Sequence, residues 1–296
     1  MEEAEEKQVG VLVYIPELTH NQPLTFYLLM ITKPELARLL EQTQIIAKEV
    51  GAFIRKERTH FDVAKVEHKG FNDLVSYVDK EAELKIVKGL SKIFPEAGFI
   101  TEEGTNTTQK DIYNWVIDPL DGTTNFIHGI PVFAVSIALM EKDQVVLGVV
   151  YEINRHECFY AMKGEGAFCN DTRIKVSQAP DLAASLVSTG FPYYNFELID
   201  RYLNSMKSLM QKTHGLRRLG SAAVDLCYVA YGRTEGFFEY NLNSYDVAAG
   251  ALIVQEAGGK VTDFSGGEDY IFGRKIVASN GHIHTEFLKT LAEFWA

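Results

Sequence analysis

The chain of 296 residues is short of three things: cysteine, long apolar runs and positive charge. Its three cysteines include no CxxC pair, which argues against a disulfide framework or a zinc ribbon and favours a reducing, cytoplasmic setting. No stretch reaches the roughly 18–20 apolar residues that a membrane-spanning helix needs. Acidic residues outnumber basic ones by 40 to 29, so binding to an anionic membrane or direct binding to nucleic acid is disfavoured.

The first residues, MEEAEEK, are acidic where a secretory signal is basic, which again favours a cytoplasmic protein. Hydrophobic residues make up 46% of the chain and charged residues 23%, as is typical of a globular protein with an apolar core. The length of 296 residues suggests about two domains or one large one. The acidic balance leaves an anionic substrate possible, because bound metal ions can reverse the local field.

The predicted elements change character near residue 180. Two helices come first, followed by an antiparallel meander of strands at 98–101, 115–118, 132–140, 145–152 and 158–162. Beyond residue 180 strands and helices alternate, which implies a layered sheet with helices on its faces. We therefore predict an α/β fold with an α+β N-terminal half, 33–180, and an α/β C-terminal half, 181–296. Residues 1–31 form an N-terminal extension to which the sequence assigns no role.

The most informative segment is WVIDPLDGTTNF, from Trp115 to Phe126. Its apolar start predicts a buried strand, which Pro119 is expected to end because proline has no N–H for the ladder. Two carboxylates, Asp118 and Asp121, follow at the strand end, beside a glycine that allows close approach to the backbone. This combination suits a hard cation together with a phosphate.

Other acids stand at the ends of predicted elements: Asp79 and Asp246 at helix starts, and Glu102 after the strand 98–101. Taken singly, the two aspartates read as ordinary helix N-caps and the glutamate as part of a solvated loop. Taken together with the two aspartates of the motif, they converge on one sheet edge, where carboxylates repel and raise one another's pKa values. Divalent cations relieve that repulsion, and oxygen ligands favour Mg²⁺ or Mn²⁺ over zinc.

These motifs carry a family resemblance. WVIDPLDGTTNF is similar to the metal-binding signature of the inositol monophosphatase family. Four more segments resemble that family in the same order: DLVSYVD (Asp73–Asp79), FITEEG (Phe99–Gly104), GSAAVDLCYVAYGRTEGFFE (Gly220–Glu239) and YDVAAGALIVQEAGG (Tyr245–Gly259). The resemblance runs from about residue 33 to the C-terminus. The chain departs from the family pattern at Ser76, Thr101 and Tyr245, and none of these changes removes a candidate ligand.

The resemblance implies a layered αβαβα sandwich of the sugar-phosphatase type and a Mg²⁺-dependent, lithium-sensitive phosphatase that forms a homodimer. The half 33–180 would bind the metals and the half 181–296 would face the substrate. Glu102, Asp118 and the backbone carbonyl of Leu120 would hold one Mg²⁺. Asp118, Asp121 and Asp246 would hold a second, with Asp118 as the bridge.

The resemblance also implies catalytic roles. Asp79 and Glu102 could share a third, weaker ion. Backbone N–H groups of Gly122 and Thr123 would bind phosphate oxygens. Thr123, hydrogen-bonded to Asp79, would orient the attacking water, and Glu102 would help remove its proton.

The implied substrate is a polyol phosphate monoester, with Asp121, Glu239 and the backbone of Ala222 contacting hydroxyls of the leaving group. Glu239 favours myo-inositol 1-phosphate. Fructose 1,6-bisphosphate and 3′-phosphoadenosine 5′-phosphate remain alternative substrates. A hypothesis of another class is a regulatory protein that keeps the fold and acts by binding, since some relatives bind transcription machinery.

Overall fold

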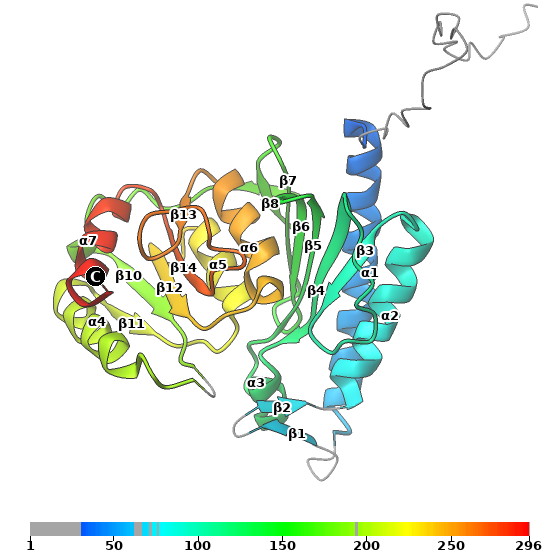
Figure 1. Ribbon diagram of the computed structural model, residues 1–296, viewed down its shortest axis with the longest axis horizontal. Helices are drawn as coiled ribbons and strands as arrows, with labels where there is room; N and C mark the ends of the chain where they lie inside the picture. The colour runs from blue at the N-terminus through cyan, green and yellow to red at the C-terminus, as the bar shows by residue number, and fades with distance from the viewer. Residues whose placement is uncertain (1–30, 62–66, 71–72, 76, 193–194, 296) are drawn as a thin grey trace, which may run out of the picture. The chain divides into compact units, whose positions relative to one another are not determined.

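A sheet of seven strands forms the largest layer of the protein (Figure 1). The computed structural model describes residues 31–61, 67–70, 73–75, 77–192 and 195–295. The strands lie in chain order across the sheet: β3 (Gly98–Thr101), β4 (Tyr113–Asp121), β5 (Ala134–Glu141), β6 (Gln144–Glu152), β7 (Glu157–Met162), β8 (Ala167–Cys169) and β9 (Thr172–Ile174). Only β3 and β4 are parallel, and every later pair is antiparallel, so the predicted meander is confirmed.

Strand β4 does not end where the sequence predicts. It continues past Pro119 to Asp121, and the expected stop after Asp118 is wrong. Asp118 pairs with Ser136 and Asp121 with Ala134, so three steps along β4 face two along β5. This β-bulge accommodates a proline that cannot donate to the ladder. Because side chains alternate along a strand, the extra residue also brings Asp118 and Asp121 to the same side.

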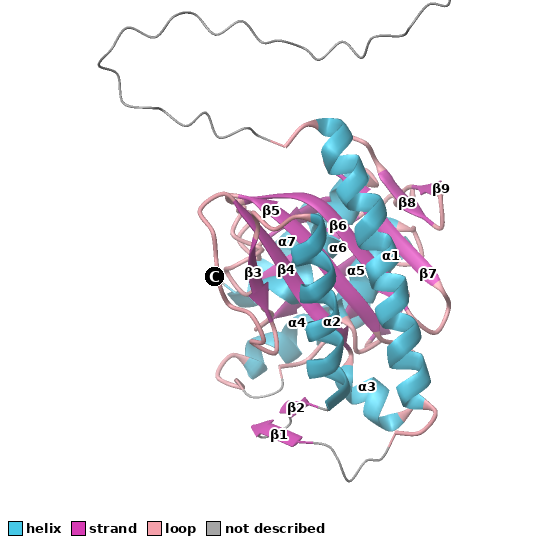
Figure 2. Ribbon diagram, turned by 90° about the vertical axis from the view of Figure 1, so that its right-hand side faces the viewer, coloured by secondary structure: helices cyan, strands magenta, loops and turns pink. Residues whose placement is uncertain are grey.

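Two long helices, α1 (Lys33–Arg58) and α2 (Tyr77–Ile93), cover one face of this sheet (Figure 2). Both are amphipathic, and their buried residues recur at helical spacing, as in the series Leu39, Ala47, Val50 and Ile54 of α1. The predicted starts of these helices agree with the structure to within two residues. Asp79 is the third residue of α2, so the N-cap interpretation of this aspartate is wrong.

A second, five-stranded sheet lies beyond the first, with the order β11-β10-β12-β14-β13. Its strands are β10 (Leu186–Thr189), β11 (Gly215–Arg217), β12 (Gly236–Tyr240), β13 (Lys260–Thr262) and β14 (Lys275–Ser279). It is mixed, because β10 pairs parallel to β11 and β12 whereas β14 runs antiparallel to both of its neighbours.

Helices α5 (Ala222–Ala230) and α6 (Ser244–Glu256) fill the space between the two sheets (Figure 1). They are apolar on nearly every side, as expected of helices buried on all faces. Helices α4 (Ile199–Lys212) and α7 (His284–Trp295) pack on the outer face of the second sheet around Tyr202, Phe238 and Phe287. The predicted αβαβα layering is thus confirmed.

Several short elements were not predicted from the sequence. They are the hairpin β1 (Glu67–Gly70) and β2 (Asp73–Val75), the short helix α3 (Thr123–His128), the 3₁₀ turn Leu182–Ala184, strands β8, β9 and β14, and helix α7. The N-terminal extension lies outside the described residues up to residue 30, as does Ser76. In the part of the chain that the structure describes, no helix has the length and apolarity to cross a membrane.

Candidate active site

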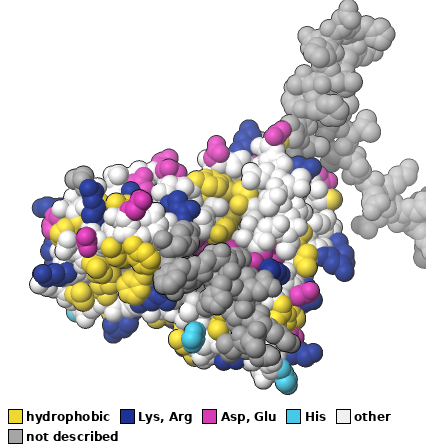
Figure 3. Space-filling model, turned by 60° about the horizontal axis from the view of Figure 1, so that its bottom comes forward, with side chains coloured by type: hydrophobic (Ala, Val, Ile, Leu, Met, Phe, Trp, Pro, Cys, Tyr) yellow, Lys and Arg dark blue, Asp and Glu magenta, His cyan; other side chains and the backbone are white. Residues whose placement is uncertain are grey.

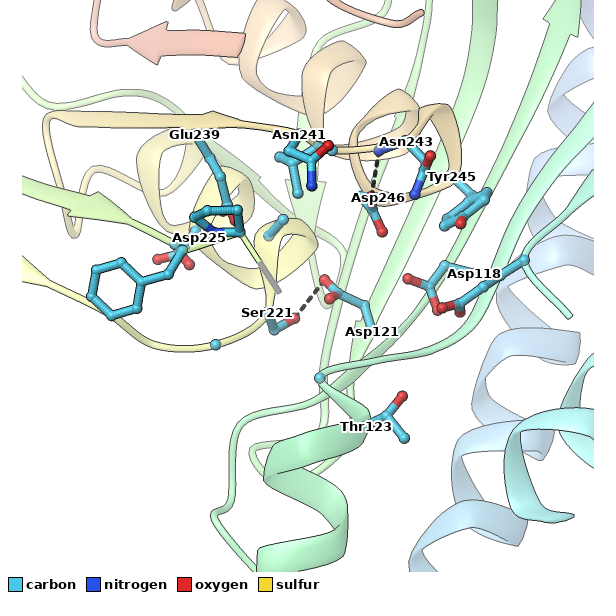
Figure 4. Close-up of a pocket in the computed structure, with 18 of the residues that line it drawn as sticks. Asp118, Asp121, Thr123, Ser221, Asp225, Glu239, Asn241, Asn243, Tyr245 and Asp246 are labelled. Carbon is cyan, nitrogen blue, oxygen red and sulfur yellow. Dashed lines mark hydrogen bonds between the residues drawn. The ribbon is translucent and has the colours of Figure 1, made fainter. Parts of the chain in front are cut away.

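A cavity of about 250 Å³ opens where the bulged end of β4 meets α5, α6 and β12 (Figure 4). All but one of the predicted site residues line it: Glu102, Asp118, Leu120, Asp121, Gly122, Thr123, Ala222, Glu239 and Asp246. The exception is Asp79, which is fully buried and hydrogen-bonded to the lining residue Thr123. Segments far apart in the sequence therefore meet in one pocket.

Four carboxylates gather at the end of the cavity nearest β3 and β4. Because β3 and β4 are parallel, Glu102, just after β3, and Asp118 reach the same sheet edge. Asp121 joins them through the bulge. Asp246 enters from the first turn of α6, where its Oδ2 accepts a hydrogen bond from Asn243 N–H at 2.6 Å. Asp246 is thus the third residue of α6 in a capping box, so its interpretation as an ordinary helix N-cap is wrong.

Burial raises the pKa of every one of these acids, and neighbouring carboxylates raise it further for Glu102, Asp118 and Asp246. For Glu102 burial is the larger cause and Asp246 the next, and its pKa rises well above the usual value. Burial and then Glu102 raise the pKa of Asp118 in the same way. Burial raises the pKa of Asp121 to about 6. Burial and the Asp121 carboxylate raise the pKa of Asp246 to about 7. Folding therefore concentrates negative charge that a cation would relieve.

The turn after β4 is shaped around Gly122 and Thr123. Gly122 has φ +98°, and a Cβ there would lie 3.0 Å from the Val132 carbonyl oxygen, so glycine is required both by conformation and by space. Thr123 then begins α3. Its hydroxyl lies 2.9 Å from Asp79 Oδ1 and 3.0 Å from the Leu120 carbonyl oxygen, and it can donate its proton to either. The hydroxyl oxygen keeps lone pairs for a further partner.

Asp121 occupies the middle of the cavity, held from one side only. Its Oδ2 accepts hydrogen bonds from Ser221 Oγ at 2.7 Å and from Ala223 N–H at 2.6 Å (Figure 4). These donors belong to the N-terminus of α5, where Ser221 is the N-cap. The neighbouring Ala222 also lines the cavity. The α5 start therefore fixes the Asp121 side chain between the two ends of the pocket.

The donor set suits a hard divalent cation. Carboxylate oxygens and the Leu120 carbonyl supply only oxygen ligands, and Glu102 Oε2 is buried without a hydrogen-bond partner. Among the described residues, no group of three or more acidic, histidine or cysteine side chains forms a ready-made ion cage. Mg²⁺ does not require one, because it keeps several waters and commonly binds through one or two carboxylates.

The other end of the cavity contains residues that sequence reasoning missed. Asp225 and Arg218 both line it, as does Phe191, whose ring lies 5.4 Å from the Arg218 guanidinium carbon. The Ser221 N-cap could have been recognised, since serine directly precedes an apolar helical run. Asp225 gave no such signal, because it sits inside that run. Arg218 gave no such signal either, because a basic residue beside a strand is most often part of a structural ion pair.

The surface around the site is mixed in charge. On the face shown in Figure 3, the basic and acidic side chains of the described residues are interspersed, and no large basic patch gathers among them.

Comparison with known proteins gives consistent matches. A sequence model of the inositol monophosphatase family matches residues 35–296. Nus factor SuhB of Escherichia coli K12 is 43% identical over 249 residues, covering 83% of this chain and 93% of that protein. Putative Nus factor SuhB of Neisseria meningitidis serogroup B is also 43% identical, over 247 residues, covering 83% and 95%. The solved IMPase structure of Thermotoga maritima is 39% identical with a TM-score of 0.80, covering 86% of this chain and 97% of that one.

The family match includes every acidic residue of the cavity, and the structural match covers 86% of the chain. The resemblance predicted from the five motifs is confirmed. The chain belongs to the inositol monophosphatase family.

Proposed function

We propose that the protein is a Mg²⁺-dependent phosphatase that hydrolyses a polyol phosphate monoester, with myo-inositol 1-phosphate as its substrate. Members of the family are phosphomonoesterases. One observation carries the proposal for this chain: a single cavity joins Glu102, Asp118 and Asp246 at one end to Glu239 at the other, with Asp121 between them. A phosphate could bind beside a cation at the first end, and the hydroxyls of the leaving group could bind Glu239 at the other.

The residues at the carboxylate end would hold cations at two positions. Glu102, Asp118 and the Leu120 carbonyl would hold one Mg²⁺, and Asp118, Asp121 and Asp246 the other. Bound Mg²⁺ would polarise phosphoryl oxygens and lower the pKa of a coordinated water. A third ion near Asp79 and Glu102 would be weaker.

Thr123 would orient the attacking water. Its hydroxyl proton is engaged by buried Asp79, so the Oγ1 lone pairs are left to accept a hydrogen bond from that water. Glu102 lies in the same part of the cavity and would accept the water's second proton as the bond to phosphorus forms.

The start of α3 would bind the phosphate. The first N–H groups of a helix have no intrahelical acceptor, and the close backbone approach at Gly122 leaves room for phosphate oxygens. On the far side Asp121, Glu239 and the Ala222 backbone would contact leaving-group hydroxyls. Most of the rate enhancement would come from positioning and electrostatics, as in phosphoryl transfer generally.

Phosphate release from a substrate panel tests the proposal. The panel would contain myo-inositol 1-phosphate, fructose 1,6-bisphosphate and 3′-phosphoadenosine 5′-phosphate, each measured with and without Mg²⁺ and Li⁺. The Asp118→Asn variant is the control, because it weakens both cation positions while keeping the side-chain shape. We expect inositol phosphate to be the best substrate and the variant to lose at least about a hundredfold in turnover. Near-normal activity of Asp118→Asn would refute the assigned cation ligands.

A second candidate function is binding to transcription machinery. The relatives named Nus factor SuhB are 43% identical to this chain, and this similarity favours the idea. A pull-down with wild type and Asp118→Asn as baits would separate binding from catalysis. Retention of transcription proteins by both baits would support a role independent of turnover, and retention by neither would reject it.

A further inference from the structure

Asp225 is a buried acid of the cavity that the proposed reaction does not use. It lies in α5, one turn from the Ser221 N-cap, and only 1% of its surface is exposed. It nevertheless lines the cavity. Its Oδ1 has no hydrogen bond of normal geometry, and the Ser188 hydroxyl on β10 is close enough to lower the pKa of Asp225. A buried carboxylate oxygen without a full hydrogen bond is destabilising, so its retention at a cavity wall needs a reason.

Asp225 shares its wall with Glu239. Figure 4 shows the two side chains on the same side of the cavity, opposite Asp118, with Asp121 and Ser221 between. Glu239 is 6% exposed and comes from β12, so strand and helix bring the two carboxyl groups together. Burial raises the pKa of Glu239 well above its usual value, and Asp225 is the next cause. The two carboxylates therefore repel each other electrostatically.

The wall is built to keep this pair in place. A Cβ on Gly190 would lie 2.1 Å from both carboxylate oxygens of Glu239, so only glycine lets that side chain approach the strand end. Arg218 is the one cationic residue among the described lining residues, and its positive charge lowers the pKa values of both Asp225 and Glu239. A partly compensated pair of carboxyl groups at a cavity wall, one with an oxygen that lacks a normal hydrogen bond, suits a ligand that offers several donors.

We propose that Asp225 is a specificity-determining residue that binds a hydroxyl of the polyol leaving group beside the hydroxyl bound by Glu239. The inference rests on the proposed phosphatase function and extends it to a residue outside the family motif roles. A polyol supplies neighbouring O–H donors, whereas a ring without hydroxyls would leave both acids without a ligand donor. Discrimination of this type is strong, because the wrong ligand leaves buried polar groups unpaired.

Kinetics on two matched substrates test the assignment. Myo-inositol 1-phosphate and cyclohexyl phosphate have the same six-membered ring and the same type of ester, but only the first has ring hydroxyls. We expect Asp225→Ala to lower kcat/KM for inositol phosphate at least about tenfold, mainly through KM, because a hydrogen bond to a charged group is lost. Its kcat/KM for cyclohexyl phosphate should stay within about twofold of wild type.

Two further variants keep the test decisive. Asp225→Asn retains the shape and one acceptor oxygen, so it should lose less on inositol phosphate than Asp225→Ala and nothing on cyclohexyl phosphate. Glu235→Gln changes a carboxylate just before β12 that lies outside the cavity lining and accepts a hydrogen bond from Leu186 N–H at 2.7 Å. It should treat the two substrates alike. Thermal melting would confirm that each variant is folded.

The outcomes separate the two levels of the proposal. Equal losses on both substrates, or no loss on inositol phosphate for either Asp225 variant, would overturn the role of Asp225 while wild-type activity still supported the phosphatase. A wild-type protein that releases phosphate from neither polyol substrate nor cyclohexyl phosphate would overturn both. A selective loss in Asp225→Ala with partial recovery in Asp225→Asn is the expected result.

Discussion

At the scale of single residues, the hydroxyl of Thr123 connects the buried part of the site to the cavity. Asp79 lies behind it and is fully buried, and its Oδ1 accepts a hydrogen bond from the Thr123 hydroxyl at 2.9 Å. Thr123 itself lines the cavity. When a carboxylate accepts the hydrogen bond of a hydroxyl group, the lone pairs of the hydroxyl oxygen point in a fixed direction. Such an oriented acceptor can hold a water in line with a phosphate.

Thr123→Val removes this acceptor while keeping the branched shape. We expect kcat to fall about 10²–10³-fold with little change in KM, because the hydroxyl acts on the water and not on the bound ester. Thr123→Ser keeps the hydroxyl and should retain most of the activity. Steady-state kinetics on inositol 1-phosphate decide the matter, and a Ser variant as inactive as the Val variant would argue against the role of the hydroxyl.

Gly190→Ala should act on the substrate through Glu239. The added methyl would collide with both carboxylate oxygens of Glu239, so that side chain must move. We expect a loss of at least about tenfold in kcat/KM for inositol phosphate and a much smaller loss for cyclohexyl phosphate, since a displaced acid no longer pairs with a hydroxyl. Glu239→Ala should show the same pattern. If Gly190→Ala proves active on inositol phosphate at the wild-type level, Glu239 does not contact the sugar.

At the scale of elements, most of the fold could be predicted because long amphipathic or apolar runs dominate it. The runs that form α1, α2 and strands β3 to β7 have clear periods, and all of them were predicted, although the predicted end of β4 was wrong. Short elements such as β8, β9 and α3 lack enough residues for a period. The bulge at Pro119 could not be predicted, because it depends on register with β5.

The residues of the site also divide into those that the sequence could predict and those that it could not. Asp118, Asp121 and Asp246 could be predicted because they belong to local motifs with turn residues beside them. Asp225 could not, because it stands in the apolar run AAVDLCYVA and only the packing of α5 beside β12 shows that it meets Glu239. Residues whose role depends on a distant partner carry no local signal.

Gly148→Ala tests the packing of α6 on the first sheet. Gly148 lies in the middle of β6, and a Cβ there would be 2.9 Å from the Ala249 carbonyl oxygen and 3.0 Å from its Cα. Backbone atoms cannot yield as a flexible side chain can, so the layers must separate slightly. We expect the free energy of unfolding to fall by about 1–3 kcal/mol. Urea denaturation measures this, and an unchanged midpoint would show that the helix can shift without cost.

At the scale of the whole molecule, the layered fold concentrates negative charge in a protein that is already acidic. The formal net charge is −11, and four carboxylates, one buried and three partly buried, meet in the cavity between the two sheets. The unfolded chain separates these acids and hydrates them. Without a cation, the folded state therefore carries an electrostatic cost that depends on pH.

This cost predicts how stability changes with pH in protein stripped of divalent cations by EDTA. Folded Asp246 keeps its proton up to about pH 7, whereas an unfolded aspartate releases it near pH 4. Between these values the folded state binds more protons, so the free energy of unfolding falls as pH rises from about 4 to about 7. Asp121, with a pKa of about 6, adds to the fall over a narrower range.

Asp246→Asn isolates the contribution of one group. The asparagine keeps an oxygen that can accept the hydrogen bond from Asn243 N–H, but it has no carboxyl proton to release. In urea titrations between pH 4 and pH 7.5, the cation-free variant should lose less stability with rising pH than wild type, by up to about 1.4 kcal/mol per pH unit. Mg²⁺ should flatten the wild-type dependence, because it binds the ionised acids of the folded state only. Parallel curves for wild type and variant would mean that Asp246 titrates normally, and the crowded carboxylates would then have to be compensated by groups of the protein itself.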